Sequence, residues 1–194
     1  MQNHFYAMMS RMKNIFRWGL MRNTRRENLS EHSLETAQIA HALALIGNKR
    51  LGKSYNANFA AVAAMYHDTP EIITGDMPTP VKYYNSEIKE VYKDIEKAAE
   101  KRLTDMLPED FKEDFAALYS PDKDTARLVK AADKLSALIK CIEEENMGNQ
   151  DFHKAKAAQL AYLQGMELPE VTYFLEHFIE SFALTIDEQN GQEE

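Results

Sequence analysis

The chain of 194 residues has little of what disulfide frameworks, membrane spans and sheets require. It contains seven glycines, six prolines and a single cysteine, Cys141. One cysteine excludes an internal disulfide and is typical of proteins from a reducing compartment. No apolar run approaches the roughly 18 residues that span a bilayer, so we expect no membrane partner. The scarcity of turn-forming residues, beside many Ala, Leu, Glu and Lys residues, favours helices over sheets.

Basic residues are fewer than acidic ones: 23 Lys and Arg against 31 Asp and Glu. The formal net charge is −8 and the isoelectric point is near 5.3. The phosphates of a long nucleic acid need a basic surface, so we exclude such a partner. A mononucleotide is compatible with this charge, because a single phosphate needs only one or two cations. The first 26 residues lack acidic side chains, as transit peptides do, but they are not rich in serine, and we expect a cytoplasmic protein.

Apolar residues recur at helical spacing through most of the chain, and no segment shows the alternation of strands. We find no internal repeat and no low-complexity linker. The sequence therefore predicts one all-α domain over residues 1–194, with an acidic tail that begins near residue 187 and frays. The predicted helices cover residues 3–16, 31–46, about 57–67, 86–106, 108–119, 121–142, 151–166 and 169–186.

Three helix starts carry specific predictions. Ser30 is expected to cap the helix that begins at residue 31. Thr69 is expected to cap a short helix with Pro70 at its first position, and Ser120 with Pro121 to begin the helix that follows. Pro78 and Pro80 are expected to stiffen residues 76–80 into a loop.

The pair His67-Asp68 is the centre of the functional hypothesis. An alanine-rich apolar run leads to it, and two more carboxylates, Glu71 and Asp76, follow. An imidazole and a carboxylate at the end of a buried helix can form half of a metal site, although such a pair alone is weak evidence. His32 and Asp133 are candidates for the other half, and these ligand types suit Zn, Co, Mn, Fe or Ni.

Two of the candidate residues have a competing structural interpretation. Asp133 stands among alanines within a helix, where burial requires a partner, and Lys130 and Lys134 can provide a simple surface ion pair. Trp18 either fills the domain surface or, beside Arg17, forms a flat wall suited to a sugar and a phosphate.

Several sequence blocks occur together and in order. They are Arg17-Trp18, Arg22-Asn23, Glu27-Asn28, Ser30-Glu31-His32-Ser33, His67-Asp68 and Thr74–Tyr83. In this arrangement the chain resembles the bacterial 5′-deoxynucleotidases of the HD-domain phosphohydrolase superfamily. These are helical enzymes that bind a divalent metal through an H…HD…D ligand set. The resemblance extends over nearly the whole chain, with Thr69-Pro70 as a departure after the His-Asp pair.

The resemblance implies a metal site and a fold. The chain would be a single HD-domain helical bundle, and His32, His67, Asp68 and Asp133 would bind one divalent ion. We favour Co²⁺, with Mn²⁺ or Zn²⁺ as alternatives. Asp133 would also contact the substrate.

The resemblance also implies roles around that site. Arg17 would orient the substrate phosphate, and Trp18 would exclude a 2′-hydroxyl. Asp76, Met77, Pro78 and Thr79 would hold the nucleotide, with Asp76 near the phosphate or sugar. Asp76 would also be one of the catalytic residues, together with Glu71 and Arg17. Glu71 would donate the proton to the departing 5′ oxygen. That role needs a raised pKa, whereas a helix N-terminus lowers the pKa of a carboxyl.

The predicted function is hydrolysis of deoxyribonucleoside 5′-monophosphates. The alternatives are a triphosphohydrolase or other phosphohydrolase of the same fold, and a non-catalytic module that senses a nucleotide. His4, His41, His153 and His177 are scattered without the pattern of a second metal site. Since related enzymes are dimeric, we also expect a homodimer.

Overall fold

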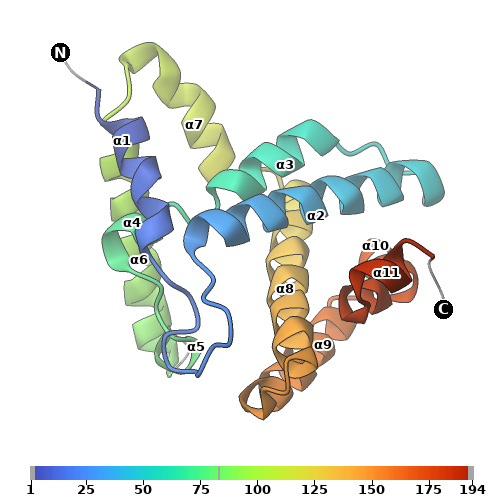
Figure 1. The fold of residues 1–194 in the computed structure, drawn as a ribbon. Helices are drawn as coiled ribbons and strands as arrows, with labels where there is room; N and C mark the ends of the chain where they lie inside the picture. The colour runs from blue at the N-terminus through green and yellow to red at the C-terminus, as the bar shows by residue number, and fades with distance from the viewer. Residues whose placement is uncertain (1–2, 83, 192–194) are drawn as a thin grey trace.

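Two long helices cross at the centre of the molecule, and a shorter helix lies alongside one of them. In the computed structural model, which describes residues 3–82 and 84–191, α2 (Leu29–Arg50) runs beside α3 (Ala57–Tyr66), and α8 (Lys123–Asn146) crosses both (Figure 1). Within the described residues the backbone forms no strand, only one isolated bridge between Phe16 and Asn28. The predicted all-α class is confirmed.

Alanine allows these helices to approach closely. Buried alanines of α3 face buried alanines of α2 and α8, and leucines fill the space around them. With no side chain beyond Cβ, alanine lets backbones pack at short range without loss of packing density. The core alanines and leucines include Ala37, Ala40, Ala44, Ala60, Ala63, Ala64, Ala131, Ala132, Leu43, Leu128, Leu135 and Leu138.

The other elements surround this centre on two sides. A second apolar cluster of Phe5, Leu103, Leu107 and Phe115 joins the N-terminal segment to α6 and α7. The remaining helices are α1 (Phe5–Met9), α4 (Glu71–Thr74), α5 (Thr79–Lys82), α6 (Ser86–Thr104), α7 (Lys112–Tyr119), α9 (His153–Gly165), α10 (Pro169–His177) and α11 (Ile186–Gln189). Four 3₁₀ helices cover Ser10–Asn14, Glu109–Phe111, Gln150–Phe152 and Ile179–Ala183.

Two of the predicted helix caps are wrong by two residues. Asn28, not Ser30, caps α2, and it forms a capping box with Glu31. Asp122, not Ser120, caps α8. In both cases the side chain that accepts the backbone N–H groups of the first turn lies two residues from the predicted serine, and Asn, Asp and Ser are about equally good N-cap residues, so residue type alone does not choose between them.

The predicted role of Thr69 is also wrong. Its hydroxyl bonds to the carbonyl oxygen of Tyr66 at 2.8 Å and to the hydroxyl of Tyr119 at 2.8 Å, and α4 has no side-chain cap. Thr69 therefore ties the end of α3 to α7 instead of starting α4.

Two loop predictions need smaller corrections. The predicted loop over residues 76–80 passes into α5 at Thr79, and Tyr83 of the same sequence block lies outside the described residues. In the acidic tail, Thr185 forms a capping box with Glu188 and starts α11, so this part of the tail is helical. None of the described helices has the length and apolar content needed to cross a membrane.

A buried carboxylate holds the loop that precedes α2. Glu144 on α8 accepts hydrogen bonds from the backbone N–H and hydroxyl of Thr24 at 2.9 and 2.7 Å, and from the backbone N–H of Arg25 at 3.2 Å. The Asn149 amide donates at 2.7 Å, and Lys140 pairs with the same carboxylate while also donating to the Arg25 carbonyl. The Glu144 and Lys140 side chains are only 1% and 6% exposed, so the loop is pinned by an ion pair that water does not screen.

We expect Glu144→Gln to lower the free energy of unfolding by about 3–5 kcal/mol, because removing one partner leaves the Lys140 charge buried and unpaired. Urea denaturation at neutral pH measures this loss. Glu143→Gln, the same substitution at the exposed neighbouring position, is the control and should be close to wild type. Equal stability of both variants would show that Glu144 does not hold the loop.

The difference between wild type and Glu144→Gln should shrink in acid. Burial raises the pKa of Glu144, but the bonds from Lys140, Thr24 and Asn149 outweigh it and lower that pKa to about 2 from the ordinary 4.5. A depressed pKa contributes stability above the unfolded value and loses it as pH falls toward the folded value. Denaturation series between about pH 5 and about pH 2.5 would follow this loss. A difference independent of pH would contradict it.

Candidate metal centre and active site

The structure brings the four predicted metal ligands together where α2, α3 and α8 meet. His32 lies in the first turn of α2, His67 and Asp68 follow the end of α3, and Asp133 lies within α8. The His32 Nε2 atom is 3.4 Å from Asp68 Oδ2 and 3.5 Å from Asp133 Oδ1. His67 Nε2 is 3.1 Å from the same Asp68 oxygen, and one ligand atom each of His32, His67 and Asp68 lies within 4.8 Å of the others.

These side chains fit a divalent cation. His67 Nδ1 donates to the carbonyl oxygen of Ala64 at 2.7 Å, which leaves Nε2 as the nitrogen with a free lone pair. That Nε2 is buried and forms no hydrogen bond of good geometry, although Asp68 Oδ2 is close. A histidine fixed through one nitrogen, with the other directed at carboxylates, is typical of metal ligands. Imidazole with carboxylate suits a first-row divalent ion.

Opposite charges stabilise the carboxylates at the centre. Burial raises the pKa of Asp68, but His67 and His32 outweigh it, and the pKa lies well below its usual range. The pKa of Asp133 is low for a similar reason, with Lys130 and His32 outweighing its burial. Both groups are therefore ionised and available as ligands at neutral pH.

His32 shows the reverse shift. Burial and the Arg17 charge lower its pKa, but the bonds with Asp133, Asp68 and Glu27 outweigh them and raise it to about 10. A proton on Nε2 occupies the position that a cation would take. A cation and this proton therefore compete for one lone pair.

The two oxygens of Asp133 have different surroundings. Its Oδ2 atom accepts a hydrogen bond from Lys130 at 2.8 Å and lies 3.5 Å from Lys134, as in a helix-surface ion pair. Its Oδ1 atom faces inward, 3.5 Å from His32 and 3.9 Å from Arg17. The lysines bind one oxygen and leave the other directed at the metal centre.

Glu27 holds Arg17 and Trp18 in place. The sequence placed Glu27 in one of the blocks that carry the resemblance, but gave it no predicted role. The Arg17 guanidinium donates to both Glu27 oxygens at 3.1 and 3.2 Å, and the Trp18 indole N–H donates at 2.8 Å. Trp18 adopts a φ of 62°, a left-handed conformation that is unfavourable for an aromatic residue and requires support from its surroundings. The sequence signal was the lone acid at the end of an arginine-rich loop, directly before the cap of α2.

Trp18 packs against the protein surface and also lines a cavity. Its ring packs on Phe152 with centroids 5.3 Å apart, so it fills part of the surface. It also lines a cavity of about 310 Å³ together with Arg17 and residues 76–80, and this volume lies at the low end of small-molecule sites. Lys134 and Gln159 line the same cavity and were not predicted. A second cavity of about 210 Å³ is lined by His67, Asp68 and Asp133 and therefore borders the predicted ligands directly.

Glu71 is a protonated acid beside the centre. It is 7% exposed, stands first in α4, and its Oε2 atom is buried without a hydrogen-bond partner. Burial, with Asp68 and Asp76, raises its pKa to about 9 against the effect of Lys82 and Arg17. Burial therefore prevails over the helix N-terminus, whose dipole is small in a single turn. The charge of a bound cation would act in the opposite direction.

Asp76 lies at the edge of the larger cavity. Burial raises its pKa, while Arg17 and a hydrogen bond from the Trp18 backbone act against this rise. Asp76 is thus connected to both residues of the Arg17-Trp18 pair. Met77, Pro78 and Thr79 continue the wall of the same cavity.

Comparison with known proteins relates this geometry to a family. The family model of the 5′-deoxynucleotidase YfbR-like proteins matches residues 4–182. A 5′-deoxynucleotidase of Photobacterium profundum is 52% identical over 190 residues, covering 96% of this chain and 98% of the relative. The 5′-deoxynucleotidase YfbR of Escherichia coli K12 is 50% identical over 192 residues and 96% of each chain.

Solved structures agree on the fold. An HD-domain phosphohydrolase from Listeria innocua superimposes with a TM-score of 0.81 at 23% identity, over 96% of this chain and 92% of that one. The cyanophage S-2L HD phosphohydrolase, described as bound to dA and one catalytic Zn²⁺, superimposes with a TM-score of 0.70 at 20% identity, over 93% and 99%. The HD-domain fold and the enzyme class predicted from the sequence are confirmed, and the chain belongs to the 5′-deoxynucleotidase YfbR-like family.

Proposed function

We propose that this protein hydrolyses deoxyribonucleoside 5′-monophosphates to a deoxynucleoside and inorganic phosphate with the help of one divalent cation. The observation that carries the proposal is a centre of two imidazoles and two carboxylates beside a cavity that Arg17 and Trp18 line. The chain is also about half identical to relatives that bear this activity in their names.

His32, His67, Asp68 and Asp133 would hold the cation. When bound, it would offset the charge that builds on the phosphorus and lower the pKa of a nearby water. Arg17 lies within 3.9 Å of Asp133 and is held by Glu27, so its guanidinium faces the same centre. From there it can orient the substrate phosphate through charge-assisted hydrogen bonds.

Glu71 is the proton donor in this proposal. Its raised pKa keeps a proton on the carboxyl at neutral pH, and its buried Oε2 has no competing partner in the protein. A neutral acid next to the phosphate can protonate the departing 5′ oxygen. Asp76, close to Arg17 and Trp18, would contact the phosphate or the sugar, and Met77, Pro78 and Thr79 would line the nucleoside.

Trp18 is the determinant of sugar preference in this proposal. The indole N–H is held by Glu27 and the ring packs against Phe152, so the indole cannot move aside for an added hydroxyl without losing these contacts. A rigid wall discriminates between substrates that differ by one group more strongly than a mobile side chain does.

The remaining properties are inferred from weaker support. We favour Co²⁺, with Mn²⁺ or Zn²⁺ as alternatives, because the ligand types do not select among them. Exposed apolar side chains near the C-terminus, Phe178, Leu184 and Ile186, support a homodimer. A single buried free cysteine supports a reducing, cytoplasmic location. We take residues 1–194 as one HD domain.

Two other functions are tested by the same assay. A triphosphohydrolase of this fold would release triphosphate from dATP, and a sensor would bind nucleotide without turnover. Among the described residues, only His32, His67 and Asp68 form a cluster of three metal-binding side chains at close range, which favours a single-ion enzyme.

Metal-stripped protein should release phosphate from dAMP once Co²⁺, Mn²⁺, Zn²⁺ or Mg²⁺ is added back singly. Release from dAMP should exceed that from AMP and dATP, and Asp68→Ala should abolish it because a ligand is lost. Colorimetric phosphate detection measures each case. Triphosphate release from dATP would move the function to the triphosphohydrolases, and tight binding without turnover under every metal would indicate a sensor.

Trp18→Ala should narrow the preference for dAMP over AMP by about tenfold, because an added hydroxyl then finds space. The ratio of kcat/KM for the two substrates is the measurement. An unchanged ratio in a folded variant would remove Trp18 from sugar selection.

Glu27→Gln should lower kcat/KM for dAMP by about 10- to 100-fold, because Arg17 and Trp18 lose their shared charged anchor and shift from the phosphate and sugar. Steady-state kinetics with saturating metal measure this loss, and Glu143→Gln is the control. Wild-type kinetics in Glu27→Gln would show that Arg17 and Trp18 are positioned without it.

A further inference from the structure

A buried chain of hydrogen bonds runs behind the metal centre, on the side of His32 that faces away from the other ligands. His32 Nδ1 is 2.9 Å from the hydroxyl of Ser136, and that hydroxyl is 2.5 Å from Glu35 Oε2. His32 and Ser136 are both 0% exposed. These hydrogen bonds therefore link His32 on α2 to Ser136 on α8, and Ser136 to Glu35 back on α2.

The direction of these bonds follows from the number of protons available. A serine hydroxyl has one proton, and in this chain Ser136 donates it to the Glu35 carboxylate. Its oxygen can then only accept from His32, so His32 Nδ1 carries the proton and donates. The hydroxyl of Thr36 is 3.4 Å from both ring nitrogens and therefore does not select between them. Glu27 Oε1 is 3.6 Å from Nδ1, so this carboxylate attracts the Nδ1 proton but lies farther away than the Ser136 hydroxyl at 2.9 Å.

Helix geometry places these groups in two matching pairs. His32 and Glu35 are three residues apart on α2, and Asp133 and Ser136 are three residues apart on α8. Residues at this spacing lie on the same side of a helix. Each helix thus presents one ligand to the metal centre and, one turn further on, one member of the hydrogen-bond chain behind it.

We infer that Ser136 and Glu35 are positioning residues that hold His32 in the Nδ1-protonated tautomer, with the Nε2 lone pair directed at the metal site. This inference rests on the metal centre of the proposed function. A metal-binding histidine needs a partner for its other nitrogen, and this partner sets both the tautomer and the ring orientation. His67 obtains that partner from the Ala64 carbonyl, whereas His32 obtains it from Ser136.

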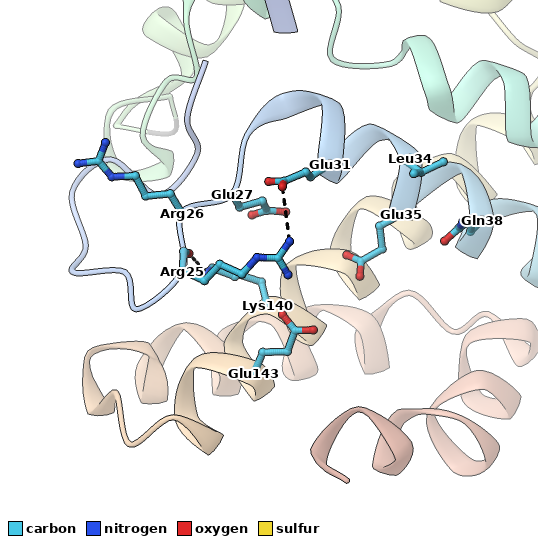
Figure 2. Close-up of a pocket in the computed structure, with 9 residues that line it drawn as sticks. All are labelled: Arg25, Arg26, Glu27, Glu31, Leu34, Glu35, Gln38, Lys140 and Glu143. Atoms are coloured by element: carbon cyan, nitrogen blue, oxygen red, sulfur yellow. Dashed lines mark hydrogen bonds and ion pairs between the residues drawn. The ribbon is translucent and has the colours of Figure 1, made fainter. Parts of the chain in front are cut away.

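At its Glu35 end, the chain of hydrogen bonds reaches a third cavity, separate from the cavities of about 310 and 210 Å³ described above. Figure 2 shows Glu35 projecting from α2 into this hollow of about 270 Å³, which Arg25, Glu31 and Glu143 also line. Glu35 is half-buried, so its substitution removes a carboxylate at a cavity wall and not from the packed core. Glu143 lines the same cavity and has an exposed side chain, which makes it a matched control.

The test measures metal affinity directly. Wild type, Ser136→Ala, Glu35→Ala, Glu35→Gln and Glu143→Gln are prepared metal-free, and Co²⁺ affinity is measured by competition with a chromophoric chelator. Thermal unfolding of each metal-free protein shows whether it is folded. The d–d absorption of bound Co²⁺ reports whether the geometry of the ligand set has changed.

Ser136→Ala should weaken Co²⁺ binding by about 10- to 100-fold, because the Nδ1 proton of His32 loses its buried acceptor. Glu35→Ala should weaken it by about tenfold, because the Ser136 hydroxyl becomes free to donate to Nδ1 and to favour the wrong tautomer. Glu35→Gln keeps an oxygen that accepts from Ser136 and should recover most of the loss, and Glu143→Gln should bind as wild type does.

Equal Co²⁺ affinity in wild type, Ser136→Ala and Glu35→Ala would overturn the inference. If Glu143→Gln lowers Co²⁺ affinity as much as Glu35→Ala does, the inference is also overturned. The affinity would then depend on the net charge of the cavity and not on the hydrogen bond between Ser136 and Glu35. If Ser136→Ala does not fold, the comparison of Glu35→Ala with Glu35→Gln decides. Absence of phosphate release from dAMP would refute the proposed function without changing these affinities, so the two failures are distinguishable.

Discussion

Charge compensation at the crossing of α2 and α8 is the constraint on which the rest of the molecule depends. Asp68, Asp133, Glu27, His32 and Arg17 are largely withdrawn from water within a few ångströms of one another. Burying any one of these charges alone would be costly, and only the alternation of signs makes the group tolerable. The same alternation keeps the two aspartates ionised and the histidine strongly basic. A site prepared in this way offers a cation ligands that are already deprotonated or that exchange one proton for the metal.

The loop before α2 shows how distant residues support this centre. Arg17 and Trp18 lie outside the helices, and their backbone is tied to the loop by only a few hydrogen bonds, including the one from the Arg17 N–H to the Glu27 carbonyl oxygen at 3.0 Å. Glu144 pins the loop to α8, and Glu27 then fixes the two side chains from within the loop. Two glutamates outside the predicted ligand set thus determine the positions of the guanidinium and the indole. A side chain on a loop can be held as firmly as one on a helix when buried charges fix both its backbone and its own polar atoms.

Glu71 illustrates a competition that only three-dimensional surroundings resolve. Its position at the start of α4 favours the ionised carboxylate, whereas the role of proton donor that we propose for it requires the neutral form. The helix is a single turn, whereas burial and two neighbouring aspartates act together, so the neutral form prevails. The distance along the sequence from Asp68 or Asp76 gives no measure of this effect, because the shift depends on desolvation and on through-space separation.

The sequence alone determined the helical class, the approximate helix ranges, the family and the residues expected at the centre. Helical periodicity and the ordered blocks around His32, His67 and Thr74 are local signals, readable without knowledge of packing. Helix starts were less certain, since Ser30 competed with Asn28 and Ser120 with Asp122 for backbone N–H groups only a residue or two apart. Tertiary structure decided which distant groups meet: Glu27 with Arg17 and Trp18, Glu144 with the loop, and Ser136 with His32 and Glu35. These partners come from separate turns or separate helices, and the physical reason they escape the sequence is that hydrogen bonds and desolvation act across space, where residues 100 positions apart can be nearest neighbours.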